Sequence, residues 1–219
     1  MIITKQKELK DIVKAARPAK SLFLVGCGDC ATLCRTGGEK ELREMTERLE
    51  REGISVTGSD VVNAPCHELD TRRVLRKNKN SVADADAVLV MACGAGIQAV
   101  GDSIDKPVVS GCDSLFIGNS QRQMHFYEKC SACGDCVLNS TAGLCPETRC
   151  PKRLLNGPCS GAVGGKCEVD KEIDCVWILI YERFKSQGRL DDFMRIVQPK
   201  DHSVSRMPHR LEEPVRPAR

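Results

Sequence analysis

Cysteine is the residue type in this chain that is best suited to chemistry, and its spacing is the first guide to function. The 219-residue chain contains 14 cysteines. Eight of them lie close together in the C-terminal half, in the order Cys130, Cys133, Cys136, Cys145, Cys150, Cys159, Cys167 and Cys175. Thiolates are soft ligands that favour zinc and iron-sulfur clusters. Because this segment is rich in glycine and has no long apolar run, we expect bound metal to contribute to its folding.

The run Cys130-x2-Cys133-x2-Cys136 has the spacing of ferredoxin ligands. Ligands at every third residue can reach three irons of one cubane, and the Cys-Pro pairs at 145 and 150 resemble the Cys-Pro that closes a ferredoxin motif. Structural zinc more often uses two CxxC pairs that are well separated in sequence. The triple run therefore favours an iron-sulfur cluster over zinc.

Disulfide bonds and inert buried thiols both fit the cysteines less well than metal ligation does. A disulfide scaffold requires an oxidising compartment, and the N-terminus lacks the apolar run and small-residue cleavage site of an export signal. Inert buried thiols account for a few isolated cysteines, but not for overlapping CxxC units that enclose glycine. We therefore expect reduced thiols in a cytoplasmic protein.

The N-terminal half has the pattern of an α/β domain with an open parallel sheet and flanking helices. Apolar strands alternate with amphipathic helices, which is typical of this class. The predicted strands are 21–27, 54–62, 87–92 and 106–112, and the predicted helices are 5–17, 39–52, 70–79 and a short one reaching 104. Each strand delivers a cysteine at or just beyond its end, namely Cys27, Cys66, Cys93 and Cys112. In such sheets ligands bind outside the carboxyl ends of the strands, so these thiols are expected to converge there.

The loop after the first of these strands carries Cys27, Cys30 and Cys34 ahead of a helix N-terminus, whose dipole favours negative charge. Together with Cys93 they are the preferred ligands of a cluster at the sheet edge, and Cys66 is the close competitor. Cys112 remains open between a ligand and a plain buried thiol. A phosphate-binding loop is the rival interpretation, but the segment lacks both GxGxxG and GxxxxGK[ST].

The predicted organisation is an α/β domain over 1–118, a cysteine-rich metal-cluster module with closing helices over 119–198, and an extended tail over 199–219. The tail contains several prolines and basic residues and has too few apolar residues to fold alone. With 33 basic and 30 acidic residues, the charge balance does not indicate nucleic-acid binding. No segment approaches the roughly 20 apolar residues of a membrane span.

Five motifs in the same order resemble the methylenetetrahydrofolate reductase C-terminal family, which includes the small iron-sulfur (MetV-type) subunit of bacterial two-subunit reductases. The resemblance extends over most of residues 1–198. The motifs are VGCGDCATLCRTGGEK at 25–40, ACGAGIQ at 92–98, LLNGPCSG at 154–161, GKCE at 165–168 and CVWILIYER at 175–183.

The resemblance implies an electron-transfer subunit of a methylenetetrahydrofolate reductase complex, with no flavin or folate site of its own. Its partners would be a flavin-bearing catalytic subunit, which reduces 5,10-methylenetetrahydrofolate to 5-methyltetrahydrofolate, and an external electron donor. We expect two [4Fe-4S] clusters, one at the sheet edge and one on Cys130, Cys133 and Cys136 with Cys145 or Cys175. A third tetrad contains Cys150, Cys159, Cys167 and the remaining thiol, and holds either a further cluster or zinc.

Two more classes of function remain open from the sequence. One is a structural zinc-binding scaffold in one-carbon or methyl transfer. The other is a thiol-redox enzyme that acts through CxxC pairs and holds no tight metal.

Overall fold

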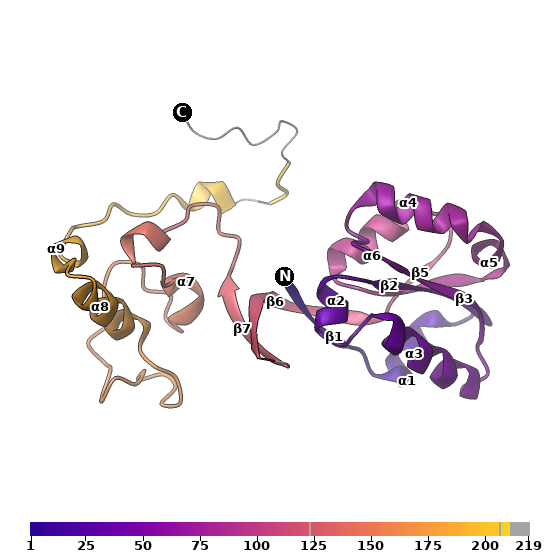
Figure 1. Ribbon diagram of the computed structural model, residues 1–219, viewed down its shortest axis with the longest axis horizontal. Coiled ribbons are helices and arrows are strands. Elements are labelled where there is room, and N and C mark those ends of the chain that lie inside the picture. Colours follow the sequence, from indigo (N-terminus) through magenta and orange to yellow (C-terminus); the bar gives the residue numbers. More distant parts are fainter. Residues whose placement is uncertain (123, 206, 211–219) are drawn as a thin grey trace. The chain divides into compact units, whose positions relative to one another are not determined.

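The computed structural model describes residues 1–122, 124–205 and 207–210 (Figure 1). The chain divides into two compact units, residues 1–127 and residues 128–219. The division falls after Tyr127, later than the boundary at 118 that the sequence suggested.

The first unit is built on a four-stranded parallel sheet with the strand order β3-β2-β4-β5. Its strands are β2 (Ser21–Cys27), β3 (Ser55–Val62), β4 (Ala87–Met91) and β5 (Val108–Ser110). The two central strands, β2 and β4, are buried almost throughout, which explains why they read as continuous apolar runs. The predicted parallel sheet is confirmed.

Helices cover both faces of this sheet, as Figure 1 shows. They are α1 (Leu9–Ala16), α3 (Glu39–Arg51), α4 (Glu68–Lys77), α5 (Lys79–Asp84) and α6 (Gly94–Gly101). Successive residues of a strand point to opposite faces, so β2 contributes to two cores. Leu22 and Leu24 pack in the core that contains residues of α1 and α3, whereas Phe23 and Val25 pack in the core that contains residues of α4, α5 and α6.

A second sheet was not predicted from the sequence. It has the order β1-β6-β7 and consists of β1 (Ile2–Gln6), β6 (Cys112–Arg122) and β7 (His125–Cys130). The predicted helix from residue 5 is therefore wrong in part, because residues 2–6 form a strand that pairs with β6. β1 pairs antiparallel with β6, for example Ile2 with Ile117, and a local sequence pattern cannot indicate so distant a partner. Cys112 consequently begins β6 rather than ending β5.

The second unit has little regular structure and a small core. Its described elements are η1 (Leu138–Ser140), α7 (Pro146–Arg149), α8 (Val176–Ser186), α9 (Leu190–Phe193) and η2 (His202–Ser205). The core is formed by Leu144, Val176, Trp177, Ile180 and Phe184, so α8 supplies most of it. The helix α8, which begins after Cys175, is one of the closing helices predicted for this region. Over the described residues, no helix is both long and apolar enough to cross a membrane.

Candidate thiolate sites

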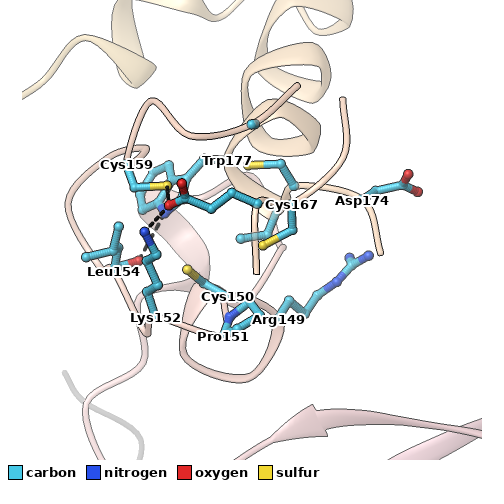
Figure 2. A pocket seen from close by; sticks show the side chains of 13 residues that line it. Arg149, Cys150, Pro151, Lys152, Leu154, Cys159, Cys167, Asp174 and Trp177 are labelled. Carbon is cyan, nitrogen blue, oxygen red and sulfur yellow. Dashed lines mark hydrogen bonds and ion pairs between the residues drawn. The ribbon is translucent and has the colours of Figure 1, made fainter. Parts of the chain in front are cut away.

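Four cysteines line one pocket of the second unit. Cys150, Cys159, Cys167 and Cys175 border a small cavity of about 20 Å³, and Figure 2 shows the first three with Trp177 around it. Cys150 directly follows α7, and Cys175 is the residue before the first turn of α8. The fold thus gathers thiols from two helix ends and from the loop between them.

Backbone hydrogen bonds hold this loop in place. The Cys167 N–H donates to the Ile173 carbonyl at 3.0 Å, and the Cys175 N–H donates to the Gly165 carbonyl at 2.8 Å. These bonds pair the two segments antiparallel around Lys166 and Asp174, so Cys167 and Cys175 lie on adjacent arms of a short hairpin. The Trp177 indole N–H donates to the Leu154 carbonyl at 3.0 Å and so anchors the segment that leads to Cys159.

Charged side chains lie directly beside these thiols. Lys152 forms an ion pair with Glu168, whose Oε1 also accepts a hydrogen bond from Cys159 Sγ at 3.3 Å (Figure 2). Glu168, and then the neighbouring thiols Cys159 and Cys167, raise the pKa of Lys152 above its ordinary value. The pocket therefore has a cation in reach of at least two of its sulfurs, which suits a site that accumulates thiolate charge.

The backbone of the 130–136 loop can donate hydrogen bonds to sulfur. Ala132 and Gly134 have positive φ angles of 54° and 81°, and the Ala132 N–H donates to Cys130 Sγ at 3.3 Å. Turns of this kind direct N–H groups toward an anion, as in many iron-sulfur sites. The ammonium of Lys200 is the main cause that lowers the pKa of Cys133, so its thiolate is favoured. Cys145 stands at the start of α7.

In the first unit, the loop after β2 passes over the end of β4. A Cβ on Gly37 would lie 1.9 Å from the Met91 carbonyl oxygen, so only glycine permits this approach. Cys27 at the end of β2 and Cys93 after β4 are both buried. Burial raises the pKa of Cys27, and the charge of Cys93 raises it further, which places the two sulfurs within electrostatic range.

Strand β1 reaches the same loop, including the short helix α2 (Cys30–Leu33). The Ile2 N–H donates to Cys30 Sγ at 3.4 Å, and Cys34 Sγ lies 3.9 Å from the Ile2 carbonyl oxygen. Burial raises the pKa of Cys30, and the nearby Cys27 contributes to that shift. Cys93 therefore affects the pKa of Cys27, and Cys27 affects the pKa of Cys30. Cys34 is buried beside Ile2.

The two remaining cysteines of this unit differ in their surroundings. Cys112 is 3% exposed and donates to the Thr36 carbonyl at 3.5 Å. Burial is the main cause that raises the pKa of Cys112 to about 12, so it is a neutral thiol at ordinary pH. This is the state expected of a plain buried thiol. Cys66 is exposed on the turn before α4.

These sets of thiols consist of soft donors, the ligand type of zinc and of iron-sulfur clusters. Among the described residues, no three Cys, His, Asp or Glu side chains are close enough to hold a single metal ion. A single zinc ion requires every sulfur within about 2.3 Å, whereas a cluster binds each thiolate through a different iron and spans a wider space. Binding of either would draw the thiols together and so be coupled to the folding of the loops.

Several residues near the thiols were not identified from the sequence. They are Ile2, whose N–H donates to Cys30, and the cations Lys152 and Lys200. The two lysines carry no distinctive spacing, and Ile2 acts through its backbone. No sequence signal would have found them.

Comparisons with known proteins give one informative match. Residues 109–203 match the family model described as "Methylene-tetrahydrofolate reductase C terminal". No curated protein matches the chain. Among solved structures, unliganded arylmalonate decarboxylase is similar, with 14% sequence identity and a TM-score of 0.34, over 47% of each chain. The chain thus spans about half the length of that protein, and the likeness is too low to carry any conclusion.

The family match covers all eight cysteines of the second unit. It contains three of the five sequence motifs, at 154–161, 165–168 and 175–183, and so supports the resemblance there, whereas the motifs at 25–40 and 92–98 lie outside the match. The segment 109–203 is thus similar to the methylene-tetrahydrofolate reductase C-terminal family.

Proposed function

We propose that this chain is the electron-transferring, noncatalytic subunit of a methylenetetrahydrofolate reductase complex. The observation that carries the proposal is the gathering of Cys150, Cys159, Cys167 and Cys175 around one pocket, inside the segment that matches the family. Soft donors gathered from distant positions are typical of iron-sulfur and zinc sites.

Cys130, Cys133 and Cys136 would hold a [4Fe-4S] cluster together with Cys145. Cys175 was the competitor for the fourth position, and its place in the other pocket leaves Cys145 as the better choice. A second observation supports this choice. Both Cys133 and Glu147 of α7 contribute to the pKa of Lys200, so α7, which begins after Cys145, lies near the 130–136 loop.

A second [4Fe-4S] cluster would lie at the edge of the parallel sheet. Cys27, Cys30 and Cys93 would be its first ligands, because Cys93 contributes to the raised pKa of Cys27 and Cys27 contributes to the raised pKa of Cys30. Cys34 is the preferred fourth ligand and Cys66 the competitor. The pocket of Cys150, Cys159, Cys167 and Cys175 would take a further cluster or zinc.

When bound, such clusters supply single-electron transfer at a potential that the surrounding protein sets. The residues of this chain would bind them through thiolates and donate backbone N–H groups to sulfur, as Ile2 and Ala132 do. Burial of Cys27 and Cys93 would exclude water from the first site. Electrons from an external donor would pass to the flavin of the partner subunit, which reduces methylenetetrahydrofolate.

A structural zinc scaffold is the second candidate function. It is favoured by the small apolar core of the second unit, which leaves the loops around the four-cysteine pocket dependent on other sources of order. This alternative predicts zinc and no iron in the chain.

The proposal is tested with Cys133→Ala and the matched variant Cys112→Ala. Each chain, purified without oxygen and reduced, is mixed with the flavin-bearing subunit while flavin reduction is followed by absorbance. Cys133→Ala is expected to lose about four irons per chain and to slow flavin reduction, because one cubane loses a ligand. Cys112→Ala should keep its iron, since that thiol is neutral and buried. Full iron content and full electron flow in Cys133→Ala would refute the assignment.

A further inference from the structure

Residues 199–205, the first part of the predicted extended tail, lie against the 130–136 loop of the same unit. The Asp201 N–H donates to Asp135 Oδ2 at 3.2 Å. Val204 covers Gly134 so closely that a Cβ on Gly134 would lie 2.9 Å from Val204 Cγ2. The rest of the predicted tail lies partly outside the described residues, at 206 and 211–219.

Lys200, in the same segment, has a buried ammonium group. Its Nζ is shielded from solvent and, within the described part of the chain, has no hydrogen-bond partner of normal geometry. A buried charge without a partner is costly, so its place in the fold requires negative charge nearby. The groups that face it are Cys133 and Asp135 of the loop and Glu147 of α7.

We infer that residues 199–205 form a strap that closes the 130–136 loop, and that Lys200 is a positioning residue whose buried positive charge compensates the thiolate ligands at Cys133. Three separate observations agree on this: the Asp201–Asp135 hydrogen bond, the packing of Val204 on Gly134, and the unpartnered ammonium. The inference rests on the proposed function, since it assigns a role in the cluster site proposed there.

A fixed cation beside the ligands has two consequences. It stabilises the more negative, reduced state of a bound cluster, because the attraction is strong where water is excluded. The cation also offsets the electrostatic repulsion between several thiolates that bind one metal site. Removal of the charge should therefore shift the reduction potential downward and speed the loss of metal.

The first test compares Lys200→Met with Lys200→Arg, which keeps the charge, and with Lys171→Met, which removes an exposed lysine of the same unit. Full-length chains are reduced stepwise with dithionite without oxygen, and the cluster signal is followed by EPR. In Lys200→Met, the equilibrium constant for one-electron reduction of the cluster is expected to fall about tenfold. This corresponds to a downward shift of about 59 mV in the reduction potential. Lys200→Arg and Lys171→Met should keep the wild-type potential. Equal potentials in all four chains would overturn the role of Lys200.

A second measurement is independent of the metal's identity. Release of bound metal to a chelator should be about tenfold faster in Lys200→Met than in the wild type, whereas Lys200→Arg should release metal at the wild-type rate. A chain that holds zinc without iron would refute the proposed electron transfer, whereas the chelator assay would still decide the role of Lys200. Equal release rates would overturn that role.

The strap itself is tested by hydrogen exchange at the Asp201 amide, which donates to Asp135. Val204→Asp should detach the strap, remove protection of that amide and speed metal release as in Lys200→Met. Met207→Asp is the matched control, since Met207 is 87% exposed beyond the strap. Rapid exchange of the Asp201 amide in the wild-type chain would overturn the strap.

Discussion

Replacement of Trp177 by phenylalanine should weaken the metal pocket without removing a cysteine. Trp177 is 7% exposed, and its indole N–H donates to the Leu154 carbonyl at 3.0 Å. Loss of this donor removes about 1 kcal/mol of net hydrogen bonding and leaves a partly buried carbonyl unpaired, for a total of about 1–3 kcal/mol. Because the bond anchors the segment before Cys159, the same free energy should be lost from metal binding. A tenfold change in affinity corresponds to about 1.4 kcal/mol, so the affinity for metal should fall about 5- to 150-fold.

The assay is competition between a chelator and the full-length chain, with metal release followed over time. Tyr181→Phe is the matched control, since Tyr181 lies on the same helix, is 37% exposed and would keep its ring contact with Phe193. That change should alter binding by less than about 0.5 kcal/mol. If Trp177→Phe releases metal no faster than Tyr181→Phe, the indole does not hold the pocket.

Two further predictions concern the first unit. The Cys112 thiol, with its pKa raised to about 12, should resist alkylation at neutral pH until the chain unfolds, and mass spectrometry of the labelled cysteines checks this. Because its pKa is raised in the folded state, its contribution to stability is full below the unfolded pKa of about 8.5 and is lost as the pH rises toward the folded value. Wild type should therefore lose more stability than Cys112→Ala between those values, and parallel unfolding curves would contradict this. Gly37→Ala should destabilise the unit by about 3 kcal/mol or more, because its Cβ would lie 1.9 Å from the Met91 carbonyl oxygen. Gly101→Ala, whose Cβ would lie 3.9 Å from the nearest atom, should be tolerated in the same thermal unfolding assay.

The parallel sheet could be predicted because its information is local. Strands β2 and β4 are buried apolar runs, and helices with clear apolar faces alternate with the strands. The antiparallel sheet could not be predicted in the same way. Residues 2–6 form a strand because they pair with β6, more than a hundred positions away.

The candidate sites show the same division between local and distant information. The spacing of Cys130, Cys133 and Cys136 indicates a shared site directly. The grouping of Cys175 with Cys150 depends on how α7 and α8 pack in the small core, which spacing does not encode. Likewise, the proximity of Lys200 to Cys133 depends on the path of the chain after α9, and no motif predicts it.

The most direct test of the account is the metal content of the chain purified without oxygen, combined with an EPR spectrum after reduction. Two [4Fe-4S] clusters predict about eight irons per chain and the signals of reduced clusters, with additional iron or zinc at the four-cysteine pocket. Zinc alone, with no iron and no cluster signal, would contradict electron transfer and make the chain a structural subunit.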